Sequence, residues 1–260
     1  MTASALLQRL WQDYARLSPQ AARIRALFEE RGERVVDDHV ALRTFDDPRV
    51  SIDVVARPFV LAGYRAAAEY TFPEKKLRAR HYEPRERGLP LLFVSELRLD
   101  ACSAELRTVV ADLLDGFSAR DDVAVAGRPW ALRRAQYDLL AAESEYGAWL
   151  AAFGYCANHF TVRVNDLGTF AGLAALNDFL KRNGFPLNTA GGEIKGSPDV
   201  HLEQSSTLAE PVEVELADGK ITVPGVYYEF ALRHRLPNGE LYLGFVERSA
   251  DKIFESTDRR

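Results

Sequence analysis

The chain has 260 residues, and 47% of them are hydrophobic, which is enough for a sizeable core and excludes a disordered protein. The formal net charge of −5 comes without a long basic run, so the charge pattern does not indicate nucleic-acid binding. No segment reaches the roughly 18 to 20 apolar residues of a membrane span, and the N-terminus lacks a secretory signal pattern. Cys102 and Cys156 lack the spacing of a disulfide framework or a thiolate zinc site. We therefore expect a cytoplasmic protein that binds a small molecule, and neither a membrane nor nucleic acid.

Two helices are predicted at the N-terminus. Apolar residues recur at helical spacing from Ser4 to about Leu17, and Ser18-Pro19 is typical of the start of a second helix, which runs to about Glu30. A strand, a helix and three more strands are then expected over residues 35–45, 51–61, 65–72, 77–82 and 91–99. This β-α-β-β-β order leads into two connecting helices over 103–116 and 135–153.

The same order is predicted again in the second half. It begins with a strand over 158–164 and a helix over 167–181, and it ends with a strand over 225–235 that follows a hairpin signal at Asp218-Gly219. We predict a single domain, 1–260, of the α+β class. Its segments are N-terminal helices (1–34), a first module (35–100), a helical connector (101–156), a second module (157–247) and a C-terminal tail (248–260).

A short pattern occurs twice, as Asp38-His-Val-Ala-Leu-Arg43 and as Asn158-His-Phe-Thr-Val-Arg163. The two histidines, His39 and His159, lie 120 positions apart. Residues i and i+4 of a strand share a face, so each histidine should point the same way as the arginine that ends its pattern. The repeat predicts a duplicated fold in which each half supplies one metal ligand.

A second match supports the duplication. His81-Tyr82-Glu83 recurs as His201-Leu202-Glu203, again 120 positions apart. We interpret this match as a register that is kept through the third strand of each module.

Glu229 is the candidate third ligand. It lies in the apolar run Tyr227–Leu232, and a lone carboxylate that faces a protein interior is costly unless it is paired or bound to a metal. Two histidines and one carboxylate form the facial set of oxygen-activating iron sites, which leaves coordination positions open. Glu96, in the last strand of the first module, would be the unused counterpart of Glu229.

Each of these residues also has a structural interpretation. A strand histidine is often only hydrogen-bonded in the core, and Glu229 could pair with an arginine across the sheet. Arg43 shares a face with a proposed ligand and is the candidate for substrate binding, whereas a structural salt bridge is favoured for Arg163 and Arg233. The polar run 203–207 would either line a cavity or form an exposed edge strand. No GxGxxG, P-loop, GxSxG or HExxH motif occurs, which argues against a nucleotide fold, an α/β-hydrolase and a zincin protease.

At these residues the chain resembles the vicinal oxygen chelate superfamily, whose β-α-β-β-β modules curl a sheet around a metal. It resembles more closely the 2-oxoadipate dioxygenase/decarboxylase family, formerly a domain of unknown function. The resemblance covers nearly the whole chain. It is carried by the motifs 38–45, Phe72-Pro-Glu-Lys-Lys-Leu77, Phe93-Val-Ser-Glu-Leu97, Leu202-Glu-Gln-Ser-Ser-Thr207, Tyr227-Tyr-Glu-Phe230 and Ser249–Thr257.

The resemblance implies that His39, His159 and Glu229 bind Fe(II) and that Arg43 binds a substrate carboxylate. Gln204 and Ser206 are candidates for further substrate contacts. The implied reaction takes a 2-oxo diacid and O2, and for 2-oxoadipate it yields 2-hydroxyglutarate and CO2, a step of lysine degradation. Two alternatives stay open, a glyoxalase-like isomerase or lyase that uses another divalent ion, and a non-catalytic protein of the same fold that binds a small ligand. The sequence does not indicate the oligomeric state.

Overall fold

An eight-stranded sheet, with strand order β2-β3-β4-β1-β5-β10-β7-β6, forms the centre of the computed structural model, which describes residues 2–118 and 122–247. The first half contributes β1 (Asp37–Phe45), α3 (Ile52–Leu61), β2 (Tyr64–Phe72), β3 (Leu77–Pro84) and β4 (Leu91–Leu97). The second half contributes β5 (Ala157–Arg163), α7 (Leu173–Arg182), β6 (Lys195–Ser197), β7 (Leu202–Ser206) and β10 (Tyr227–Arg233).

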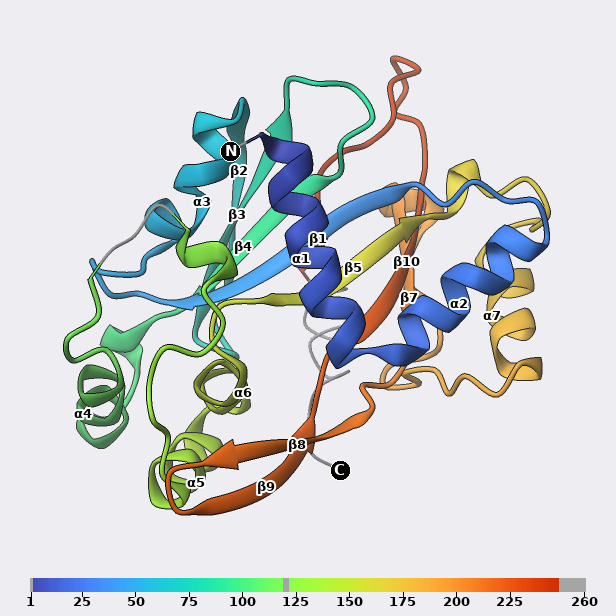
Figure 1. Cartoon of the computed structure of the whole chain (residues 1–260). Helices are drawn as coiled ribbons and strands as arrows, with labels where there is room; N and C mark the ends of the chain where they lie inside the picture. The colour runs from blue at the N-terminus through green and yellow to red at the C-terminus, as the bar shows by residue number, and fades with distance from the viewer. Residues whose placement is uncertain (1, 119–121, 248–260) are drawn as a thin grey trace.

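The two halves have the same topology. In each half the last strand pairs in parallel with the first, β4 with β1 and β10 with β5, and the middle strands extend the sheet outward. Antiparallel pairing of β1 with β5 joins the halves at the centre of the curled sheet (Figure 1). The prediction of an α+β fold made of two β-α-β-β-β modules is therefore confirmed.

Helices cover one face of the central strands. α1 (Ala3–Leu17) lies across β1 and β5 (Figure 1), and it is followed by α2 (Pro19–Glu30) with Pro19 in its first turn, as predicted. The rings of Trp11 and Tyr14 each lie 5.1 Å from the ring of Phe160 in β5. Because side chains alternate along a strand, His159 and Thr161 point to the opposite face.

The connector contains α4 (Ala104–Leu113), α5 (Arg134–Glu143) and α6 (Glu145–Phe153). The prediction of a single helix over 135–153 is therefore wrong, because α5 and α6 occupy this range. Ser144 leaves the helical conformation, and its hydroxyl accepts a hydrogen bond of 3.0 Å from the amide of Gly147, so it caps a new helix. Short 3-10 helices lie at Leu99–Ala101, Val123–Val125, Val164–Asp166 and Pro198–Val200.

Other boundaries differ less. α7 begins six residues after the predicted start, because a 3-10 turn ends β5 and Gly172, at φ 130°, precedes the helix. The hairpin predicted at Asp218-Gly219 is confirmed as β8 (Pro211–Leu216) and β9 (Gly219–Pro224). The bounds of the predicted segments stay predictions, and the tail 248–260 lies outside the described residues.

Strand register corrects the interpretation of the second sequence match. His39 pairs with Leu91 and His159 with Tyr227, so Phe93 is equivalent to Glu229. The antiparallel partner of Phe93 is His81, whereas the partner of Glu229 is Ser206. His81 is therefore equivalent to Ser206 and not to His201.

A backbone feature shows what His201 does correspond to. β3 begins at Leu77 opposite Leu97, and β7 begins at Leu202 opposite Arg233, which makes Lys76 the equivalent of His201. These two are the non-glycine residues with positive φ among those described, at 55° and 61°. The same left-handed turn thus leads into the third strand of each module. The histidines at positions 81 and 201 are therefore not equivalent, and their 120-residue spacing is a coincidence.

Candidate metal centre

The structure brings His39, His159 and Glu229 together on the sheet face opposite α1. The Nε2 atoms of the histidines are 3.3 Å apart, and they lie 3.4 Å and 3.5 Å from the two carboxylate oxygens of Glu229. All three side chains are buried, and their ligand atoms lie within 4.8 Å of one another. The three residues are therefore close enough to share one ion.

This spacing fits a single metal ion. With bonds of about 2.1 Å, neighbouring ligand atoms lie about 3.0 Å apart in an octahedron and about 3.4 Å apart in a tetrahedron. Glu229 is fully buried, and within the described part of the chain its Oε2 accepts no hydrogen bond. A buried carboxylate oxygen without a donor is unfavourable unless a cation binds it. The His-His-Glu set, the one such cluster in residues 2–118 and 122–247, can therefore hold a divalent metal.

Each ligand histidine is oriented by the residue before it. The Nδ1 of His39 lies 2.8 Å from Oδ1 of Asp38, and the Nδ1 of His159 lies 3.0 Å from Oδ1 of Asn158. An Nδ1–H that donates to these oxygens leaves the lone pair of Nε2 for a metal. Burial, together with the nearby His39 and Arg43, holds the pKa of His159 well below its usual range, so this ligand stays neutral.

Glu229 is held by its neighbour on β7. Gln204 donates from Nε2 to Oε1 of Glu229 over 2.5 Å. Burial raises the pKa of Glu229, although His39 and the Gln204 amide oppose that rise. A bound cation would favour the ionised carboxylate, so metal binding and deprotonation of Glu229 are coupled.

Arg43 lies on the same side of the sheet as the triad. Its guanidinium carbon is 4.8 Å from the ring centre of Tyr146 and 4.8 Å from that of Trp149, both on α6. Hydrogen bonds fix the two rings, because the Tyr146 hydroxyl donates to the carbonyl of Ser95 over 2.6 Å and the Trp149 indole donates to that of Gly225 over 2.7 Å. The planar cation is thus buried between aromatic faces that orient it.

The polar run 203–207 is internal, because β7 lies between β10 and β6. Gln204 and Ser206 are buried and share the face of Glu229, while Ser205 points to the other face and donates to Asn177 over 2.7 Å. The expectation of an exposed edge strand is therefore wrong for this run. The amide of Gln204 is engaged with Glu229, and a substrate contact of Gln204 or Ser206 stays a prediction.

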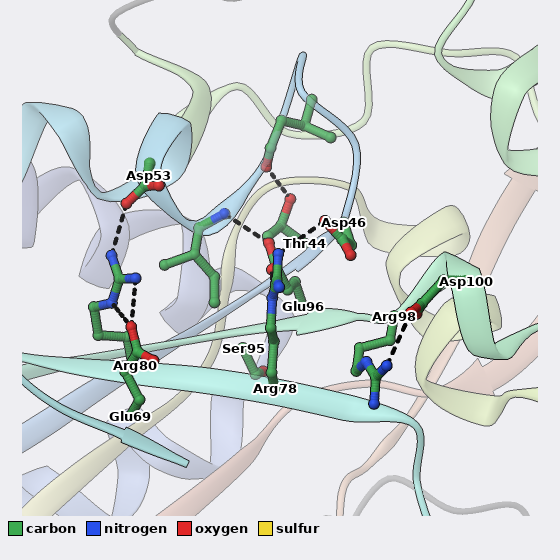
Figure 2. A network of polar contacts seen from close by, with 12 residues as sticks. Thr44, Asp46, Asp53, Glu69, Arg78, Arg80, Ser95, Glu96, Arg98 and Asp100 are labelled. Atoms are coloured by element: carbon green, nitrogen blue, oxygen red, sulfur yellow. Dashed lines mark hydrogen bonds and ion pairs between the residues drawn. The ribbon is translucent and has the colours of Figure 1, made fainter. Parts of the chain in front are cut away.

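Glu96 is not the counterpart of Glu229, since that place is held by Phe93. The side chain of Glu96 points to the α3 side of the sheet (Figure 2). There its Oε2 accepts a hydrogen bond of 2.9 Å from the amide of Ile52, and its Oε1 pairs with Arg78. Glu96 therefore caps α3, whose own N-cap residue, Ser51, makes no side-chain cap.

Sequence reasoning missed several residues around the triad. Thr161, with its hydroxyl 3.1 Å from Nε2 of His39, and Phe245, with its ring 4.8 Å from the His39 ring, are two of them. Thr161 lies two residues after His159, so the strand period could have found it. Phe245 follows the last strand, and no local pattern places it.

A candidate metal-binding triad at the centre of a curled sheet made of two β-α-β-β-β modules fits the fold of the vicinal oxygen chelate class. A glyoxalase superfamily protein from Ralstonia eutropha JMP134 shares the fold, with a TM-score of 0.75 and 24% identity over 93% of this chain and 84% of that one. Among the described helices, none has the length and apolar composition to cross a membrane.

The chain belongs to the 2-oxoadipate dioxygenase/decarboxylase family. The family model of that description matches residues 127–242. The chloroplastic 2-oxoadipate dioxygenase/decarboxylase of Arabidopsis thaliana is 35% identical over 253 residues, which cover 85% of this chain and 67% of the relative.

Solved structures support the same family. The hydroxyglutarate synthase of Oryza sativa in complex with 2-oxoadipate has a TM-score of 0.92 at 32% identity, covering 98% of this chain and 91% of that chain. A Shewanella frigidimarina protein described as a hydrolase has a TM-score of 0.90 at 44% identity, covering 94% and 97%. The chain is thus homologous to known enzymes over nearly its whole length.

Proposed function

We propose that this protein is an Fe(II)-dependent dioxygenase that converts 2-oxoadipate and O2 to 2-hydroxyglutarate and CO2 in lysine degradation. The observation that carries the proposal is the buried His39, His159 and Glu229 set in a chain so similar to a hydroxyglutarate synthase that binds 2-oxoadipate. The atoms balance, because C1 of the six-carbon substrate leaves as CO2 with its own two oxygens. Both atoms of O2 enter the five-carbon product, one in the new carboxylate and one in the hydroxyl group. The cytoplasmic location stays a prediction.

The donor set suits the proposed cofactor. Two imidazoles and one carboxylate that leave positions open are typical of non-haem Fe(II) oxygenases. When bound, Fe(II) supplies a Lewis acid for the 2-oxo acid and activates O2. The role of the chain is to orient both histidines at Nδ1, through Asp38 and Asn158, so that Nε2 faces the metal position, and to hold Glu229 with the Gln204 amide.

Arg43 is proposed to bind a carboxylate of the substrate. Its forked donors match a carboxylate, and burial strengthens the attraction between the two charges. The rings of Tyr146 and Trp149 restrict the guanidinium to one plane, so that the substrate would meet a donor that is already oriented. Gln204 and Ser206, on the same face, are proposed as further contacts.

The test is an aerobic incubation of Fe(II)-loaded protein with 2-oxoadipate, 2-oxoglutarate and 2-oxohexanoate. We expect O2 uptake and CO2 release in equal amounts, fastest with 2-oxoadipate, and 2-hydroxyglutarate as the product. 2-Oxohexanoate lacks the distal carboxylate and reports on its recognition. His39→Ala should abolish turnover, and His234→Ala, which removes a histidine paired with Glu203, is the matched control.

Two outcomes would contradict the proposal. Conversion of a substrate without O2 uptake would favour the isomerase or lyase alternative. Equal iron content in the wild type and in His39→Ala would remove the basis of the metal site.

A further inference from the structure

Asp38 and Arg233 form a buried ion pair that contacts His39 of the triad. Arg233 donates from Nε to Oδ2 of Asp38 over 2.7 Å and from Nη2 to Oδ1 over 2.8 Å, and the two side chains are 1% and 2% exposed. Oδ1 of Asp38 also faces Nδ1 of His39 at 2.8 Å. Burial by itself would raise the pKa of Asp38, but Arg233 and His39 hold that pKa well below its usual range. A single carboxylate thus contacts both a ligand histidine and an arginine of the other module.

The third guanidinium nitrogen of Arg233, Nη1, binds the segment 242–245, which follows the last strand. Nη1 donates to the carbonyls of Tyr242 and Gly244 over 3.0 Å and 2.9 Å. The next residue, Phe245, has its ring 5.1 Å from the Arg233 guanidinium carbon and edge-on to His39. The amide of Phe245 donates to the Tyr70 hydroxyl over 3.1 Å, which ties the same segment to β2 of the first module.

The duplicated fold provides an internal comparison for this pair. The equivalent of Asp38 is Asn158, and by strand register the equivalent of Arg233 is Leu97. Asn158 orients His159 at Nδ1 as Asp38 orients His39, without a charge. Orientation of a ligand histidine therefore does not require an ion pair in this fold, and the charges of Asp38 and Arg233 serve a further purpose.

We propose that Asp38 and Arg233 are positioning residues that fasten segment 242–245 over His39. The pair holds the segment through the two carbonyls, and it joins the segment to the ligand histidine through the shared carboxylate. Phe245 then covers one side of His39 and excludes water from it. The inference rests on the proposed function only in taking His39 as a metal ligand.

The double variant D38N/R233L tests the proposal, because it reproduces the Asn158–Leu97 arrangement that this protein already contains. Either single substitution would leave a buried charge without its partner and could prevent folding, whereas the double variant removes both charges. Hydrogen exchange of metal-free protein is followed in residues 242–247, with β5 and α5 as internal references. Co(II) affinity is measured in parallel.

We expect exchange in 242–247 to accelerate by about tenfold or more in the double variant, with the references unchanged. Co(II) affinity should fall by no more than about tenfold, since the amide oxygen that replaces the Asp38 carboxylate can still accept a hydrogen bond from Nδ1 of His39. R163L/D166N, which removes the half-exposed pair Arg163–Asp166, is the matched control and should change neither quantity.

Unchanged exchange in 242–247 would overturn the proposal, because packing of Phe245 would then suffice to hold the segment. Unchanged exchange with a large loss of Co(II) affinity would also overturn it, since the pair would then act on His39 alone. Exchange is measured without metal, so this result stands whether or not the protein oxidises 2-oxoadipate.

Discussion

Glu229→Gln should stabilise the metal-free protein and reduce the stabilisation that a bound metal provides. Without metal, Glu229 is a buried carboxylate with one oxygen that accepts no hydrogen bond from the described residues, and burial raises its pKa. A group whose pKa is higher in the folded state loses its stabilising contribution as the pH rises through that pKa. An amide of the same shape has no charge to bury, and its NH2 group would lie near Nε2 of His159, which is 3.5 Å from Oε2. We expect the metal-free variant to be more stable than the wild type at pH 8 by about 1–3 kcal/mol.

With metal the wild type gains more stability than the variant does. A divalent ion at 100 times its dissociation constant stabilises the wild type by about 2.7 kcal/mol, which raises Tm by about 5–10 °C for a chain of this size. Loss of one of three ligands should weaken binding by at least about 100-fold, more than loss of an outer-shell partner does. At the same metal concentration the variant then gains only about 0.4 kcal/mol, or about 1 °C.

The assay is anaerobic thermal unfolding with and without Fe(II), repeated with Co(II). Glu203→Gln is the control, because Glu203 lies on the neighbouring strand and pairs with His234 outside the triad. An equal metal-dependent rise in Tm in Glu229→Gln and the wild type would show that Glu229 does not bind the metal. A metal-free variant that is destabilised by several kcal/mol would show that Glu229 is a structural residue.

Two further predictions follow from local features. The free energy of unfolding of the metal-free protein should decrease as the pH falls below about 6.5, by up to about 1.4 kcal/mol per pH unit. The reason is that His159 takes up a proton in the unfolded chain, whereas in the folded chain its lowered pKa keeps it neutral. Urea unfolding at pH 7 and pH 5 measures this, and an equally steep loss in His159→Gln would contradict the assignment. Ser144→Ala should lower the free energy of unfolding by about 1 kcal/mol in the same assay, because it removes the side-chain cap of α6. An unchanged free energy of unfolding would mean that packing alone ends α5.

Local patterns predicted much of the fold, and their failures have identifiable causes. Helical spacing continues through residues 135–153, so it did not reveal the break at Ser144, where the side chain caps a new helix. The offset between the modules is 120 residues at the first strand, but insertions change it further along the chain. A fixed interval therefore matched His81 with His201, whereas backbone pairing matches His81 with Ser206.

Some residues of the candidate site could likewise be predicted from local patterns, and others could not. His39 and Arg43 share a face because the period of a strand is two residues, and this is a property of the local chain. Glu229 could be selected because a charge in an apolar strand needs a partner. The proximity of these residues to His159 was inferred from the duplication, and the structure confirms that His39, His159 and Glu229 lie together.

The two modules, the three candidate ligands and the accompanying arginine could be predicted from the sequence, because strand periodicity, composition and one repeated pattern indicate them. The residues that surround them are set by the tertiary structure. Asp38 and Arg233 are 195 positions apart, and Phe245 reaches His39 from beyond the last strand. The aromatic rings beside Arg43 come from a connecting helix. Contacts of this kind arise from the way the strands close into one sheet, and no local pattern encodes that closure.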